Sequence, residues 1–409
     1  MGQWMPRLTS ACGLALILLV AFLLSENRRR ISRRVLVAGL SLQLVFALLV
    51  LRTAAGRWLF QQAQDAFGAL IAASNKGAGF LFGRLVTDAS FGATVAFHVL
   101  PIVIFFSALA AVLYHLGVTQ WVVRQMARLM QRSMDVSGAE SLACALFVFL
   151  GIEATTAIAG YIRRMTRSEL FVLMTGFMAT IAGTVMAAYV SFGASAGHLL
   201  AASVMSAPAA IVIAKMMVPE TEEPLTRGKV RFEPPREAVN LIDAAARGAG
   251  QGLRLALAIG ATLIAFVGLV ALANILLGFV TGFLMPEPLT LQQVFGWAFS
   301  PVALAMGVPW DDAVAVGQLL GTKTVLNEFL AYREMQAMVQ AGALSPRAVL
   351  VATYALCGFA NFGSVAILIG GVSAIDPDRK GLVARLAVRA LVSGTLAAFT
   401  TACIAGVLA

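Results

Sequence analysis

The chain has 409 residues, of which 60% are hydrophobic and 12% are charged, and its mean hydropathy is +0.87. These proportions exclude an ordinary soluble domain and predict a polytopic membrane protein that is surrounded by a lipid bilayer. The formal net charge is +10, but Lys and Arg fall in short clusters between apolar runs, as in the cytoplasmic loops of membrane proteins, so we expect no nucleic-acid partner.

Two apolar runs, 14–24 and 35–51, lie on either side of the densest basic run of the chain, RRRISRR at 28–34. The positive-inside rule places this basic run in the cytoplasm. We interpret the first apolar run as a retained span rather than a removable signal. The pattern predicts a multi-pass protein of the inner (plasma) membrane with its N-terminus outside.

An interfacial scaffold is expected next. Residues 57–73 space apolar side chains three and four apart among glutamines, which predicts a helix lying in the membrane interface. Residues 91–116 form a third expected span, and 120–130 form a basic amphipathic helix. We assign residues 1–135 to N-terminal helices and this scaffold.

Residues 136–218 begin with a re-entrant hairpin. An apolar arm leads to a tip at 151–153, and a second arm returns to a basic cluster at 163–167. Each arm has about ten residues and would span about 15 Å, half of the hydrocarbon thickness. We therefore expect the chain to turn back inside the membrane, with Glu153 at the tip.

An interrupted span follows this hairpin. Residues 168–192 are apolar, but Gly176 and Gly183 lie on either side of Thr180. Glycine lowers helix stability by about 1 kcal/mol relative to alanine, so a break in the helix is expected there. A further span at 199–218 completes this unit.

The second half of the chain repeats the order. A polar loop of mixed charge at 219–237 separates the halves. In residues 238–300 we expect an interfacial helix at 238–250 and a scaffold span at 253–277.

Residues 301–409 are expected to hold a second hairpin, a second interrupted span and a last span. The hairpin covers 301–332. The interrupted span at 348–372 is long enough to cross a bilayer but carries the polar, glycine-containing run 358–364, and the last span covers 382–407.

Polar groups at membrane depth are the main functional signal. Glu153, Glu328 and Asn361 lie within apolar segments. A charge there costs about 2.5 to 3.5 kcal/mol on insertion scales, and an amide must find a partner or water. Because hairpin and interrupted span occur in each half, we predict an all-α polytopic membrane protein with inverted repeats, about eight transmembrane helices, two re-entrant hairpins and interfacial helices.

An enzyme is not expected. Residues 193–197 match the GxSxG expression of a nucleophile elbow, but the required strand before them is not predicted. The four cysteines stand singly in apolar runs, and the three histidines share no metal-ligand spacing. We expect no cofactor.

Long motifs carry a resemblance to a known family. They are GVPWDD at 307–312, a run containing GTK and NEF at 321–329, CGFANF at 357–362, SGAES at 137–141 and the run 176–183. Together they closely resemble signature runs of concentrative nucleoside transporters, which include bacterial cation-coupled nucleoside symporters. The resemblance covers nearly the whole chain. It implies secondary active nucleoside uptake by a homotrimer, in which hairpins and interrupted helices move against a static scaffold.

The resemblance also implies a nucleoside site. Glu328, Asn361 and Ser364 take the positions that hold the ribose hydroxyls, and Phe359 takes the position that faces the base. The chemistry agrees, because vicinal hydroxyls donate hydrogen bonds, an ionised carboxylate accepts them, and an amide does either.

The tip of the first hairpin departs from the family pattern. Gly151, Ile152 and Glu153 take the base-binding positions, but the tip is one residue shorter than the Gly-Gln-Thr-Glu or Gly-Gln-Ser-Glu of the family. Isoleucine offers no donor or acceptor. We therefore expect weak discrimination between bases.

The resemblance implies a coupling ion, which we expect to be Na⁺ or H⁺. Thr180 and Ile181 match part of the sodium site that the resemblance implies, but its Asn position falls on apolar Leu146 or Phe147. Sodium needs oxygen ligands. The alternative is proton coupling through Glu153, since a desolvated carboxylate can hold a proton.

Other interpretations remain open at this point. Glu328 could be a structural ion-pair partner of Lys323, five residues before it. The protein could also be a nucleoside-binding gate or sensor with little flux, or a transporter of a related polar solute that is not a nucleoside.

Overall fold

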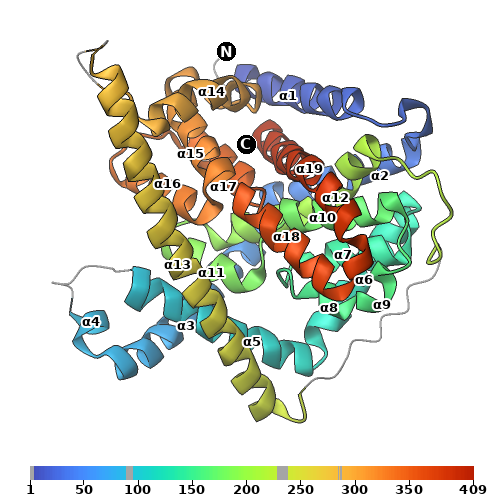
Figure 1. Cartoon of the computed structure of the whole chain (residues 1–409), viewed down its shortest axis with the longest axis horizontal. Helices are drawn as coiled ribbons and strands as arrows, with labels where there is room; N and C mark the ends of the chain where they lie inside the picture. Colours follow the sequence, from blue (N-terminus) through green and yellow to red (C-terminus); the bar gives the residue numbers. More distant parts are fainter. Residues whose placement is uncertain (1–3, 89–94, 228–237, 284, 286–287) are drawn as a thin grey trace.

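The computed structural model describes residues 4–88, 95–227, 238–283, 285 and 288–409, and these residues form helices joined by turns, with no strand (Figure 1). The helices are α1 (Trp4–Leu23), α2 (Arg33–Arg52), α3 (Ala54–Phe82), α4 (Arg84–Thr87), α5 (Leu100–His115), α6 (Val118–Met134), α7 (Gly138–Phe147), α8 (Ala154–Ala157), α9 (Ala159–Ile162), α10 (Arg167–Ala179), α11 (Gly183–Ser191), α12 (Ala196–Met217), α13 (Leu241–Thr281), α14 (Leu291–Ala305), α15 (Ala313–Val325), α16 (Glu328–Gln340), α17 (Pro346–Leu356), α18 (Phe362–Ile375) and α19 (Lys380–Leu408).

Seven helical stretches within the described residues are long and apolar enough to cross a membrane. They include the interrupted pair α10 and α11 over Arg167–Ser191. Helices α17 and α18 are too short to cross singly, but they follow one another as two halves of a further interrupted span. The predicted all-α polytopic fold is thereby confirmed.

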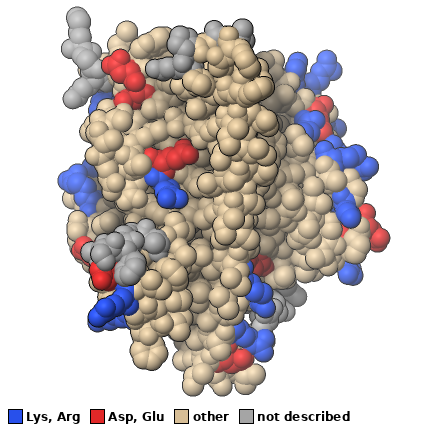
Figure 2. Space-filling view, turned by 60° about the vertical axis from the view of Figure 1, so that its left-hand side comes forward, with Lys and Arg blue, Asp and Glu red and all other residues tan. Residues whose placement is uncertain are grey.

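The distribution of charge agrees with a membrane protein. In the view of Figure 2, most Lys, Arg, Asp and Glu side chains lie along the two sides and at the bottom, and a broad area of other residues fills the centre. Many large apolar side chains are exposed, among them Ile264 (79%) and Phe279 (69%) on α13. Such a surface is stable against lipid or another apolar surface.

Two helical hairpins enter the molecule from opposite ends of α19. Hairpin one comprises α7 to α9, and Arg379, just before α19, donates to the carbonyl of Arg163 at its base (2.9 Å). Hairpin two comprises α15 and α16, and Arg347, which follows it, donates to the carbonyl of Gly406 near the other end of α19 (2.8 Å). Each hairpin is followed by an interrupted helix, so the two units have the same order of elements. Because the hairpins enter from opposite ends of α19, the two units have opposite orientations, as inverted repeats do.

Helix α13 differs from the prediction. We expected an interfacial helix at 238–250 and a separate span, but one continuous helix of 41 residues crosses the whole molecule (Figure 1). Two of its glycines allow close packing on α5. A Cβ on Gly248 would lie 2.6 Å from the carbonyl oxygen of Ser107, and one on Gly252 would lie 2.7 Å from the Cβ of Ser107. Small residues serve this purpose at helix contacts in membranes.

Other boundaries also differ. Hairpin two begins at α15 and not at residue 301, because Pro301 lies inside the separate helix α14. The interfacial helix α3 is longer than the predicted 57–73, and the returning arm of hairpin one consists of two single turns that meet at Ile158. Most of the predicted loop 219–237 and the first residues of the span 91–116 lie outside the described residues.

Candidate functional site

The tip of hairpin one contacts the break between α10 and α11, which we call break one (180–182). The backbone nitrogen of Gly183 donates to the carbonyl of Phe149 at the tip (3.2 Å). Gly183 opens α11, so its N–H group is one of those that a helix leaves without an internal partner. The tip thus satisfies a donor that the interruption of the helix exposes.

Break one in turn contacts the break between α17 and α18, which we call break two (357–361). The backbone nitrogen of Phe359 donates to the carbonyl of Thr180 (3.1 Å). Gly358 has φ +155°, and a Cβ at this position would lie 2.9 Å from the carbonyl oxygen of Ala179 and 3.0 Å from that of Met178. Only glycine allows the two backbones to come this close.

Hairpin two meets break two through side chains. The amide nitrogen of Asn361 donates to Oε2 of Glu328 (3.0 Å), and both residues are almost fully buried. The amide oxygen of Asn361 accepts from the backbone nitrogen of Ser364 (2.7 Å) and so caps α18. Because the cap uses the oxygen, the nitrogen faces the carboxylate. The structure therefore brings together Glu328, Asn361 and Ser364 of the predicted site.

Tyr189 is a further member of this cluster that the sequence analysis did not identify. Its hydroxyl donates to Oε1 of Glu328 (2.8 Å), and its side chain is fully buried in α11. A buried tyrosine requires a partner for its hydroxyl, which is the one signal that the sequence offered. The partner is 139 residues away in the chain, so spacing could not reveal it.

Lys323 does not pair with Glu328. Its ammonium group donates to the carbonyl of Ala355 (2.9 Å), and no ion pair of Lys323 occurs within the described residues. Tyr332 donates its hydroxyl to the carbonyl of Thr353 (2.7 Å). Both carbonyls belong to the last turn of α17, which has no internal donors for them, and the positive charge also suits a helix C-terminus. Hairpin two thus caps the half-helix α17.

This cap leads to a first prediction. Tyr332→Phe leaves the buried carbonyl of Thr353 without its donor and should lower the free energy of unfolding by about 1 to 3 kcal/mol. The measurement is thermal unfolding of the purified protein in detergent. Tyr354→Phe is the matched control, because its hydroxyl contacts the partly buried His198 (3.2 Å) and not a helix end; an equal loss in both variants would contradict the capping role.

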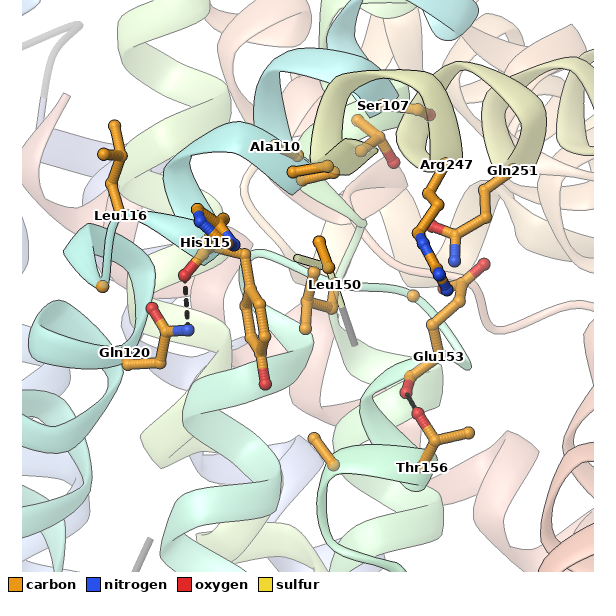
Figure 3. A pocket seen from close by; sticks show the side chains of 18 of the residues that line it. Ser107, Ala110, His115, Leu116, Gln120, Leu150, Glu153, Thr156, Arg247 and Gln251 are labelled. Carbon is orange, nitrogen blue, oxygen red and sulfur yellow. Dashed lines mark hydrogen bonds between the residues drawn. The ribbon is translucent and has the colours of Figure 1, made fainter. Parts of the chain in front are cut away.

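A cavity of about 580 Å³ lies beside the tip of hairpin one. The end of α5, the start of α6, the start of α13 and the tip itself line it (Figure 3). Glu153 and Arg247 point toward one another across it. A Cβ on Gly151 would lie 2.8 Å from Oε2 of Glu153, so the carboxylate folds over this glycine. Within the described residues, Glu328 and Asn361 do not line this cavity.

Ile152 lies elsewhere than Glu153. It packs against α18, where a Cβ on Gly371 would lie 2.4 Å from its Cγ1 atom, and it is not among the residues that line the cavity. The side chain that replaces the polar residues of the family tip therefore faces a neighbouring helix.

Aromatic rings lie near break one. The ring of Phe147 lies 5.7 Å from that of Phe177, which lies 5.8 Å from that of Phe359. Thr180 and Ile181 are buried in break one, and the hydroxyl of Thr180 donates to the carbonyl of Gly176 (2.8 Å). Among the described residues, no group of three or more His, Cys, Asp and Glu could hold a metal ion.

Two re-entrant hairpins that meet two interrupted helices define the class of membrane transporters with inverted repeats. Sequence models described as the C-terminus and N-terminus of Na⁺-dependent nucleoside transporters match residues 198–406 and 12–85, and a nucleoside-recognition gate model matches 96–196. The chain belongs to this family of nucleoside transporters, which confirms the resemblance seen in the sequence. Its relatives are transporters and not enzymes.

Several relatives resemble the chain over its full length. An uncharacterized transporter of Haemophilus influenzae is 42% identical over 98% of this chain and 98% of its own length. The mouse sodium/nucleoside cotransporter 1 is 39% identical over 100% of this chain, which spans 64% of the mouse protein. The solved structure of CNTnw in an inward-facing substrate-bound state has a TM-score of 0.93 and 41% identity, covering 99% of this chain and 98% of CNTnw.

Proposed function

We propose that this protein takes up nucleosides across the inner membrane by cation symport, with the ribose held by Glu328, Asn361 and Ser364. The observation that carries the proposal is the buried contact between Glu328 and Asn361, where hairpin two meets break two. Each oxygen of an ionised carboxylate can accept more than one hydrogen bond, so the contact leaves acceptor capacity for sugar hydroxyls. An ionisable side chain within a membrane segment is by default a candidate for a functional site, which supports this use of the pair.

We assign the base to the side of break two that faces hairpin one. Phe359 presents a ring beside break two, and Gly151 and Glu153 lie at the edge of the cavity. Ile152 contributes to this side by packing against α18. With one carboxylate at the tip, weak discrimination between bases is expected.

The coupling ion is proposed to be Na⁺ or H⁺. The hydroxyl oxygen of Thr180 and the backbone carbonyls of break one could act as oxygen ligands of sodium. The hydroxyl donates a hydrogen bond, which leaves its lone pairs free. The side chains of Leu146 and Phe147, one of which takes the Asn position, offer no oxygen. The alternative is proton coupling through Glu153, whose side chain is exposed to the cavity.

A gradient experiment tests the coupling. In proteoliposomes, we expect an inward sodium gradient alone or a proton gradient alone to drive accumulation of radiolabelled uridine. If accumulation needs sodium and is lost in Thr180→Val, the coupling ion is Na⁺. If accumulation needs a proton gradient and is lost in Glu153→Gln, the coupling ion is H⁺. Equal uptake with neither gradient would contradict symport.

Orientation and assembly are part of the proposal. The basic run at 28–34 and the basic residues around the base of hairpin one favour a cytoplasmic position for that end, with the N-terminus outside. A homotrimer is proposed by analogy with the family, and the exposed apolar surface of α13 is available for a contact between copies or with lipid.

The second candidate function is a nucleoside-binding gate or sensor with little flux. The departure of the hairpin-one tip from the family pattern favours it. Flux into sealed vesicles distinguishes the two, because a sensor binds nucleoside without accumulating it.

A further inference from the structure

The carboxylate of Glu328 receives one hydrogen bond on each oxygen. The hydroxyl of Tyr189 donates to Oε1 (2.8 Å) and the amide nitrogen of Asn361 donates to Oε2 (3.0 Å). We infer that Tyr189 is a positioning residue that orients this carboxylate for a pair of vicinal hydroxyls, so that it sets the selectivity for ribose. The inference rests on the proposed function and names a determinant of its specificity.

Tyr189 is itself held firmly. Its ring stacks on that of Tyr332 at 4.7 Å with an interplanar angle of 24°, and it meets the ring of Phe329 edge-on at 6.3 Å. Tyr332 is fixed in turn by its bond to the carbonyl of Thr353. A ring packed in this way cannot change its rotamer, so its hydroxyl is a donor with a fixed position.

Two fixed donors have a chemical consequence for the carboxylate. An ionised carboxylate has about four lone-pair positions. Tyr189 and Asn361 use one on each oxygen, which prevents rotation of the group and leaves one acceptor position on each oxygen. These two neighbouring acceptor positions match two adjacent sugar hydroxyls. A sugar that lacks both hydroxyls leaves both acceptor positions without a donor.

The hydroxyl also links two parts of the site. Tyr189 belongs to α11, directly after break one, and Glu328 opens α16 of hairpin two. Without this bond, Oε1 of Glu328 would lose its donor, and the carboxylate could turn about the remaining contact to Asn361. Recognition of the diol should then weaken, while recognition of the base should stay the same.

The test compares two substrates in one protein. Competition against radiolabelled uridine uptake in proteoliposomes gives the apparent affinities of uridine and of 2′,3′-dideoxyuridine. We expect Tyr189→Phe to lower the apparent affinity for uridine about tenfold and to leave the apparent affinity for the dideoxy compound unchanged. Tyr354→Phe is the control, because its hydroxyl contacts His198 (3.2 Å) and not Glu328, and its ratio of affinities should equal that of the unmodified protein. An equal loss for both compounds in Tyr189→Phe, or an unchanged ratio, would overturn the inference.

Further outcomes are separable. If the unmodified protein takes up no nucleoside, the proposed function fails. If it takes up both compounds equally well, the ribose site assigned to Glu328, Asn361 and Ser364 fails together with the inference. If it prefers uridine and Tyr189→Phe keeps that preference, only the inference fails. Should Tyr189→Phe not fold, Tyr189→Phe combined with Glu328→Gln decides, because a neutral amide no longer needs the hydroxyl donor. The inference expects the double variant and Glu328→Gln alone to give the same ratio of affinities for the two compounds, because the hydroxyl acts only through the carboxylate; a lower ratio in the double variant would overturn it.

Discussion

Replacing Glu328 with glutamine is expected to lower nucleoside uptake by about 100-fold or more. The glutamine has nearly the same shape and still offers an oxygen to the amide nitrogen of Asn361. It loses the negative charge, however, and one of its two acceptor atoms becomes a donor. Charge-assisted hydrogen bonds to two sugar hydroxyls are therefore lost together. The measurement is initial-rate uptake of radiolabelled uridine, corrected for the amount of folded protein.

Glu334→Gln is the matched control for this variant. Glu334 lies on the same helix, α16, but its carboxylate accepts from the hydroxyl of Thr322 (3.0 Å) and not from break two. Uptake by this variant should stay close to that of the unmodified protein. Saturable uptake in Glu328→Gln at the normal rate would show that the ribose does not bind there.

Alanine at position 358 is expected to destabilise the protein by roughly 2 to 4 kcal/mol, because it combines overpacking with an unfavourable backbone conformation. The added Cβ would lie 2.9 Å from the carbonyl oxygen of Ala179 and 3.0 Å from that of Met178. These are backbone atoms that cannot turn aside as a flexible side chain can, so break two would have to move away from break one. Thermal unfolding in detergent measures the loss, and uptake should fall with it.

Gly370→Ala provides the comparison. Gly370 lies in α18, and a Cβ added there meets nothing within 4 Å, so the substitution should be neutral or slightly stabilising. A melting temperature of Gly358→Ala equal to that of Gly370→Ala would mean that the two breaks are not in contact in solution.

Much of the fold could be predicted because it follows from local composition. Glycine and asparagine at the centre of a long apolar run predicted the interruption of α17 and α18, which begins one residue before Gly358. The position of Glu153 at a hairpin tip followed from the length of the two arms. Both signals are contained in a single segment and need no knowledge of its neighbours.

Contacts between distant segments could not be predicted in this way. We expected separate helices at 238–250 and 253–277, whereas the chain stays helical there and the glycines at 248 and 252 allow α5 to approach α13. Lys323 and Glu328 are close in sequence and of opposite charge, yet the lysine binds a helix end and the glutamate binds an amide and a phenol. Their choice of partner depends on α11 and α17, which only the folded structure places beside them.

The length of α13 has a consequence for how the protein sits in its lipid environment. A helix of 41 residues is about 60 Å long, roughly twice the thickness of the hydrocarbon layer, so α13 must lie steeply inclined or project beyond the bilayer. Its first turns form one wall of the cavity beside Glu153. Because α13 is one continuous helix, a change in its inclination would also move this wall of the cavity.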